Sequence, residues 1–253
     1  MPFFSHQSHR LFYRQHGQGP LLLVLPGNTA SSAHHAGELE YFGQRFRTVS
    51  LDFWGTGQSD HLAVWPDDWY QQAALDACAL VEHLGEKRCI AIGTSGGAVV
   101  ALWMAVLCPQ QVQAVIADSF TETFPPAWLE VVMQERAQRT GGQVAFWQMA
   151  HDEDWQQVVE ADSAMFVRAW SRGRSIFENR LGEIACPVLL TGSLADPILP
   201  EVSAQMLLAA QQIPGCQLYL HTVGGHPLMW SQSADFRRMS DCFLQSVLEG
   251  NDE

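Results

Sequence analysis

The chain has 253 residues, 47% of them hydrophobic, which suits one α/β domain or a core domain with a small insertion. Its formal net charge of -13, with Lys87 as the only lysine, argues against a nucleic-acid partner, because such binding needs clustered Lys and Arg. No run reaches the roughly 18 to 20 apolar residues that span a bilayer, and the N-terminus lacks a signal-peptide pattern. We therefore expect a cytoplasmic protein with no membrane partner.

The first half of the chain alternates apolar strands with helices. A strand that enters Ser95 begins at residue 89, and an almost continuously apolar helix follows it and ends at Cys108. The other expected strands cover 10–16, 20–28, 47–53 and 112–118, and the other expected helices cover 32–46 and 68–84. This order favours a mostly parallel sheet with helices on both faces.

The alternation stops at Ser119 and resumes near residue 183. The segment 119–182 has no convincing buried strand but has three or four helical stretches rich in aromatic residues. We expect a helical cap here, inserted into a core made of 1–118 and 183–253, with Trp128 and Trp147 lining a substrate pocket. Packing against the core is the simpler alternative for each of these aromatic side chains.

The remaining elements return to the first pattern. Strands are expected at 186–192 and 216–223, and helices within 195–212 and 227–248. The six cysteines show no C-x-x-C spacing, so buried thiols are expected rather than disulfides or a metal site.

A glycine-rich turn follows the strand that begins at residue 89. It reads Gly93, Thr94, Ser95, Gly96, Gly97, which is a G-x-S-x-G pattern between a strand and a helix. Such a turn holds a serine in a strained conformation at the end of a sheet, where it can act as a nucleophile. An ordinary strand-to-helix turn is the alternative, and the flanking strand and helix favour the nucleophile.

A serine nucleophile needs a base and an acid that orients the base. Asp196 follows the strand at 186–192 and His226 follows the last strand, so both are expected at the sheet edge that carries Ser95. Asp196 could instead only start a turn before a proline. Asp118 and Glu122 remain alternative acids.

The developing oxyanion needs backbone donors. We expect them from Gly96, directly after the nucleophile, and from Asn28 in the loop 25–31 that ends the early apolar run, although Asn28 could be a simple turn residue. The glycine spacings do not match phosphate or dinucleotide motifs, and the adjacent His34 and His35 have no matching carboxylate. We therefore expect no cofactor and no catalytic metal.

Together these segments resemble the α/β-hydrolase superfamily over nearly the whole chain. The matching pieces are LLLVLPGN, DFWGTGQSD, GTSGG, CPVLLTGSLADPILP and GGH. The resemblance implies an eight-stranded, mostly parallel sheet, a cap at 119–182 and the triad Ser95, Asp196 and His226. Trp54, in the second piece, is expected to approach the pocket.

Two departures narrow the resemblance. Pro26 and Gly27 in the oxyanion loop resemble the biphenyl-hydrolase-like esterases, but Gly96 stands where some of those enzymes carry an acid that attracts an amino group. Serine at position 95 argues against epoxide hydrolases and haloalkane dehalogenases, which use a carboxylate nucleophile.

The expected activity is hydrolysis of a small carboxylic ester, thioester or lactone with an apolar or aromatic moiety, through an acyl-enzyme. The same triad would also serve carbon–carbon bond hydrolysis or cofactor-free perhydrolysis. From another class, a ligand receptor with little turnover remains an alternative. The expected partner is a small molecule, and the sequence leaves the oligomeric state undefined.

Overall fold

The computed structural model describes residues 2–171, 173, 175–199 and 201–249. Its strands form one sheet in the order β1-β2-β4-β3-β5-β6-β7-β8. The pairings of β1 with β2 and of β2 with β4 are antiparallel, and the others are parallel, which confirms the expected sheet. The strands are β1 (Phe3–His6), β2 (His9–His16), β3 (Leu21–Leu25), β4 (Arg47–Leu51), β5 (Cys89–Thr94), β6 (Val112–Asp118), β7 (Val188–Ser193) and β8 (Gln217–His221).

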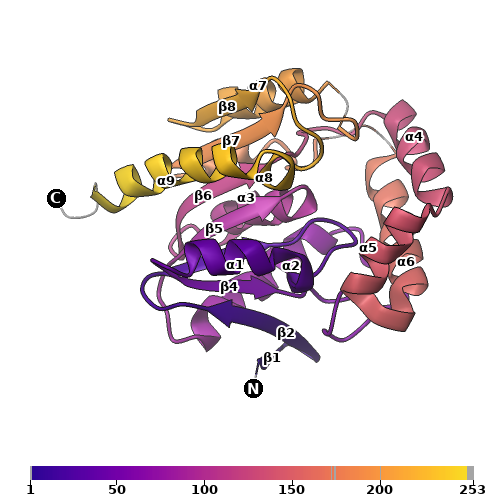
Figure 1. Ribbon diagram of the computed structural model, residues 1–253, viewed down its shortest axis with the longest axis horizontal. Coiled ribbons are helices and arrows are strands. Elements are labelled where there is room, and N and C mark those ends of the chain that lie inside the picture. The colour runs from indigo at the N-terminus through magenta and orange to yellow at the C-terminus, as the bar shows by residue number, and fades with distance from the viewer. Residues whose placement is uncertain (1, 172, 174, 200, 250–253) are drawn as a thin grey trace.

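Two hydrophobic cores lie on opposite faces of this sheet. Alternate residues of a strand point to opposite faces, so Leu21, Leu23 and Leu25 of β3 enter one core, whereas Leu22 and Val24 enter the other. A strand that is buried on both sides reads as a continuous apolar run. The first face is covered by α2 (Trp69–His83), α3 (Gly96–Leu107) and α7 (Val202–Gln212), and the second by α1 (Ala36–Phe42) and α9 (Ser233–Glu249) (Figure 1).

Three helices separate β6 from β7 and lie together on one side of the sheet (Figure 1). They are α4 (Pro126–Ala137), α5 (Gly141–His151) and α6 (Trp155–Trp170). Trp147, Trp155 and Val159 form a small hydrophobic cluster between α5 and α6. We propose 119–182 as the cap, with 1–118 and 183–253 as the core; residues 1, 172, 174, 200 and 250–253 of these ranges lie outside the described residues.

The sequence-based expectations were wrong in two places outside the cap. The short edge strand β1 was not expected, because four residues show too little alternation. The helix expected at 32–46 is a 3-10 turn (Ser32–His35) followed by α1, which ends at Phe42. A Cβ atom on Gly43 would lie 2.4 Å from the carbonyl oxygen of Leu39 and 2.4 Å from the ring of His16. Only glycine fits at this position, which directly follows the end of α1.

Shorter elements complete the described chain. They are the 3-10 turns at Asp152–Asp154 and Leu181–Glu183 and the helix α8 (Leu228–Ser231). Within the described ranges, no helix combines the length and the apolar character needed to cross a membrane.

Candidate active site

Ser95 lies at the sharp turn between β5 and α3. Its φ of 54° and ψ of -123° are strained for a residue with a side chain. The turn also requires glycine at its neighbours. A Cβ atom on Gly93 would lie 2.0 Å from the carbonyl oxygen of Gly97, and one on Gly97 would lie 2.0 Å from that of Leu25. The glycines therefore let the turn pack closely against β3 while the serine side chain stays exposed to a cavity.

Asp196 and His226 come from the loops after β7 and β8. His226 Nδ1 lies 2.8 Å from Asp196 Oδ2, and Asp196 Oδ1 accepts the backbone N–H groups of Ile198 at 2.8 Å and Leu199 at 3.0 Å. Burial alone would raise the pKa of Asp196, but its contacts with His226 and these two N–H groups hold the pKa below its usual value. The carboxylate therefore stays charged, and it fixes the Nδ1–H tautomer of His226.

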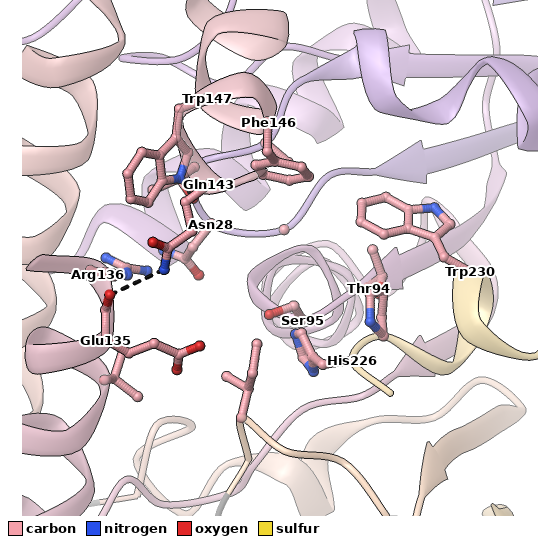
Figure 2. A pocket seen from close by; sticks show the side chains of 16 residues that line it. Asn28, Thr94, Ser95, Glu135, Arg136, Gln143, Phe146, Trp147, His226 and Trp230 are labelled. Atoms are coloured by element: carbon pink, nitrogen blue, oxygen red, sulfur yellow. Dashed lines mark hydrogen bonds between the residues drawn. The ribbon is translucent and has the colours of Figure 1, made fainter. Parts of the chain in front are cut away.

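Ser95 and His226 face one cavity of about 270 Å³, in which the cap forms a large part of the wall (Figure 2). The strands β5 and β8 thus place a hydroxyl and an imidazole in the same space, as expected for parallel strands that end at one edge. Phe146 and Trp147 of α5 and Trp230 of α8 supply aromatic surface to the cavity.

Asn28 lies directly against Gly96. A Cβ atom on Gly96 would lie 3.0 Å from the backbone nitrogen of Asn28 and 2.0 Å from its Oδ1. In the part of the chain that the structure describes, neither the Asn28 nor the Gly96 backbone N–H has a hydrogen-bond partner. Two unpaired donors next to Ser95 are what an oxyanion requires. The close contact also explains why position 96 has no room for an acidic side chain.

The cap holds the loop that carries Asn28. Asp162 of α6 is fully buried, and its Oδ1 accepts the Asn28 Nδ2–H at 2.5 Å, while Tyr70 donates its hydroxyl to Asn28 Oδ1 at 2.8 Å. Trp147 Nε1 donates to Thr29 Oγ1 at 3.1 Å. Both ends of the Asn28 amide are therefore fixed, and one of its two partners belongs to the cap.

His151, the last residue of α5, adds a further contact. Its Nδ1 accepts the backbone N–H of Gly57 at 2.9 Å, and its Nε2 lies 3.1 Å from the carbonyl oxygen of Thr29. Burial lowers the pKa of His151 to about 4. A neutral ring with the proton on Nε2 satisfies both contacts, so His151 joins the cap to two loops of the core.

Arg136 of α4 lies on the cavity wall with Glu135 and Gln143 (Figure 2). Its Nη1 donates to Asp162 Oδ2 at 2.5 Å and to Ser163 Oγ at 2.9 Å. This ion pair neutralises the buried carboxylate that holds Asn28. Asp162 thus connects a cap arginine in the cavity with the oxyanion loop.

Two of the three tryptophans expected in the pocket lie elsewhere. Among the described residues that line the two hollows beside Ser95, Trp147 is present but Trp54 and Trp128 are absent. Trp54 instead stacks on the ring of His9 with a 4.1 Å centroid separation. Trp128 packs against the hydrophobic core on the sheet face that α2, α3 and α7 cover. The aromatic residue type indicated that these side chains pack against other groups, but it did not indicate whether they point into the cavity.

The rival acids have other partners. Asp118 is buried and accepts hydrogen bonds from Thr94 at 3.1 Å, Thr191 at 2.7 Å and the backbone N–H of Met229 at 3.0 Å. Burial raises its pKa to about 6. Glu122 accepts a hydrogen bond from Ser175. The geometry therefore favours Asp196 as the acid that orients His226.

Sequence reasoning missed Asp162 and Arg136. A signal for Asp162 was present, because it lies at helical spacing from the apolar residues Val158, Val159, Met165 and Phe166 and so falls on the buried face of α6. An acid on such a face needs a polar partner, which could have marked it as a site residue. No comparable pattern marks Arg136.

Comparisons with known proteins identify relatives of this chain. A family model described as alpha/beta hydrolase fold matches residues 20–146, half of the chain. Serine hydrolase BPHL of Mus musculus is 26% identical over 254 residues, which cover 93% of this chain and 83% of that protein. RutD of Pseudomonas savastanoi pv. phaseolicola, named as a proposed carbamate hydrolase, is 25% identical over 265 residues, which cover 95% of this chain and 98% of that protein.

A solved structure shows the same fold. The enol-lactonase from Burkholderia xenovorans LB400 has a TM-score of 0.76 at 16% identity, with 96% of this chain and 100% of that chain covered. The family match, the order of the eight strands and relatives that are named as hydrolases lead to one conclusion. The chain belongs to the alpha/beta hydrolase fold family and is a hydrolase of that type.

Proposed function

We propose that this hydrolase cleaves a small carboxylic ester with an apolar or aromatic group, through an acyl-enzyme on Ser95. The observation that carries the proposal is the 2.8 Å pair of His226 and Asp196 on the cavity that Ser95 lines. The aromatic wall favours an apolar group in the substrate. Thioesters and lactones present the same type of carbonyl and fall within the proposal.

The reaction has two stages, acylation of Ser95 and hydrolysis of the acyl-enzyme. Nε2 of His226 takes the proton of Ser95 as the hydroxyl attacks the carbonyl carbon, while Asp196 stabilises the imidazolium. The N–H groups of Asn28 and Gly96 bind the oxyanion. His226 then returns the proton to the leaving alcohol, and a water molecule that it activates releases the acid from Ser95.

Two hollows beside Ser95 offer separate binding sites for the two parts of the substrate. Besides the larger cavity, a second hollow of about 40 Å³ is lined by Ser95, Gly96 and apolar side chains that include Phe124 and Phe166. A water-sized group needs at least ~10 to 15 Å³ on this measure, so the smaller hollow takes about three such groups. We assign it to the acyl chain, which limits that chain to about acetyl to butyryl, and the larger cavity to the alcohol.

A series of nitrophenyl esters tests this function. We expect kcat/KM to be highest from acetate to butyrate and to fall by about 10-fold or more at octanoate, because each added methylene that finds no space loses its burial of ~0.8 kcal/mol and causes strain. Phe124→Val enlarges the small hollow and is expected to raise the octanoate-to-butyrate ratio by about 10-fold.

The matched control is Phe146→Val, which shortens an aromatic side chain in the larger cavity and should leave that ratio unchanged. If the ratio changes only with Phe146→Val, the acyl chain occupies the larger cavity instead. A lactone and a carbamate belong in the same panel, since relatives are named for acting on such compounds. If the protein hydrolysed none of the esters, the lactone or the carbamate, the proposed function would be contradicted.

Asp162 is expected to act as a positioning residue for the oxyanion loop. Asp162→Asn removes the charge that holds the Asn28 amide, and a hydrogen bond to a charged group contributes ~1.5 to 3 kcal/mol. We expect kcat for the butyrate ester to fall by about 10-fold with little change in KM, because the oxyanion forms only after substrate has bound.

Glu160→Gln is the control on the same helix, since Glu160 is an exposed acid that pairs with Arg139 at the surface. It should leave kcat unchanged. A loss of thermal stability in Asp162→Asn without a selective loss of kcat would assign Asp162 a purely structural role.

A further inference from the structure

A second cluster of polar side chains lies in the N-terminal hairpin, apart from the cavity. His6 ends β1 and His9 begins β2, and the two residues are direct partners in the antiparallel register across a two-residue turn. Directly opposite residues of an antiparallel pair point to the same face, with Cβ atoms about 4.5 to 5.5 Å apart. The hairpin therefore presents two imidazoles side by side.

Asp76 of α2 completes the cluster from the other side. His6 Nδ1 lies 2.7 Å and His9 Nε2 lies 3.0 Å from Asp76 Oδ1, and one ligand atom from each of the three residues lies within 4.8 Å of the others. His9 and Asp76 are buried, whereas the His6 side chain is 27% exposed. Trp54 stacks on His9 and fixes its ring. The cluster is thus preformed and is open to solvent only on the His6 side.

The two oxygens of the Asp76 carboxylate differ in their hydrogen bonds. Both imidazoles converge on Oδ1, while Oδ2 of Asp76 is buried and has no hydrogen-bond partner among the described residues. An unpaired buried carboxylate oxygen is costly. A cation held between the carboxylate and the two ring nitrogens would neutralise the charge of this buried group.

We propose that His6, His9 and Asp76 form a binding site for a divalent transition-metal ion, with Zn²⁺ as the best match. Two imidazole nitrogens and one carboxylate oxygen are ligands that Zn²⁺ accepts, and a water on the His6 side would fill the fourth position. Tetrahedral bonds of ~2.0 to 2.1 Å separate ligand atoms by about 3.3 Å. The distances of His6 Nδ1 and His9 Nε2 from Asp76 Oδ1 would therefore grow from 2.7 Å and 3.0 Å to about that value, and all the ligand atoms already lie within 4.8 Å of one another.

The ion would have a structural role in this site. It would join the edge hairpin of β1 and β2 to α2, which places the ligands on two segments 67 residues apart. None of the three ligands lines either hollow beside Ser95. Metal removal should therefore affect stability and leave ester hydrolysis nearly unchanged at moderate temperature.

Co²⁺ is the probe for this site, because its visible absorption reports nitrogen and oxygen ligands directly. Tag-free protein is treated with chelator, dialysed and titrated with Co²⁺, and Zn²⁺ is then added as a competitor. We expect one equivalent of Co²⁺ to bind with visible bands that Zn²⁺ removes. At free Zn²⁺ about 100-fold above its Kd, we expect the Tm to rise by about 5 °C or more.

His6→Gln and Asp76→Asn should abolish the bands and the Tm shift. His6 is partly exposed, so His6→Gln should fold, and its esterase activity and Tm without metal verify this. His16→Gln, which changes an exposed histidine at the other end of β2, is the matched control and should bind like the wild type. Absence of stoichiometric binding in the wild type, or equal binding by folded His6→Gln, would overturn the proposal.

Discussion

Ser95→Ala is expected to lower kcat/KM for nitrophenyl butyrate by about 10⁴-fold or more. Removal of a serine nucleophile from such a triad leaves only the oxyanion donors and substrate binding to accelerate the reaction. The substitution removes one oxygen from a side chain at the cavity surface, so the fold should be retained and the Tm should change by little. Steady-state assays of both proteins, with Tm measured on the same samples, check this.

A fluorophosphonate probe gives an independent measurement of the same assignment. The wild type should form one covalent adduct on Ser95, and Ser95→Ala should form none. Ser203→Ala is the control, because Ser203 is an exposed serine on α7. Turnover no faster than background in both wild type and Ser95→Ala, together with an unlabelled Ser95, would favour a ligand receptor that keeps the fold with little turnover.

The core of the site could be predicted because it depends on local patterns. The strands β5, β7 and β8 are short runs that the sequence marks clearly, and parallel strands bring the residues that follow them to one edge. Ser95 directly follows β5, whereas Asp196 and His226 lie in the loops that follow β7 and β8. Their approach to one another is therefore a consequence of strand order, which needs no knowledge of side-chain packing.

The cap contacts could not be predicted in the same way. Which side of α6 meets the oxyanion loop depends on how three helices pack on one another and on the core, and this is set by contacts between residues far apart in sequence. Asn28 and Asp162 are separated by 134 positions. The hairpin cluster shows the same difficulty, because the spacing of His6 and His9 gives no indication of Asp76.

These cap contacts link the wall of the cavity to the loop of the proposed oxyanion donor Asn28. Asp162 bonds to Asn28, and Trp147 and His151 bond to Thr29, so the cap helices also hold the proposed oxyanion donor. A cap that moved away would therefore lose an aromatic wall and the support of Asn28 together. We therefore expect productive geometry only with the cap in place.

The last prediction separates Asp196 from Asp118, which is one of the two alternative acids that the sequence left open. Asp196→Asn is expected to lower kcat by about 10⁴-fold, because an amide that donates to His226 Nδ1 favours the tautomer in which Nε2 carries the proton and cannot accept one from Ser95. The shape of the side chain is conserved, so KM and Tm should change much less than kcat.

Asp118→Asn is the matched comparison at the end of the neighbouring strand β6. Asp118 accepts from Thr94, Thr191 and the N–H of Met229, so an amide nitrogen there would face donors and should lower the Tm. Because its hydrogen bonds go to these groups and not to His226, kcat of the folded protein should fall by no more than about 10-fold. A larger loss of kcat in Asp118→Asn than in Asp196→Asn would reverse the assignment of the acid.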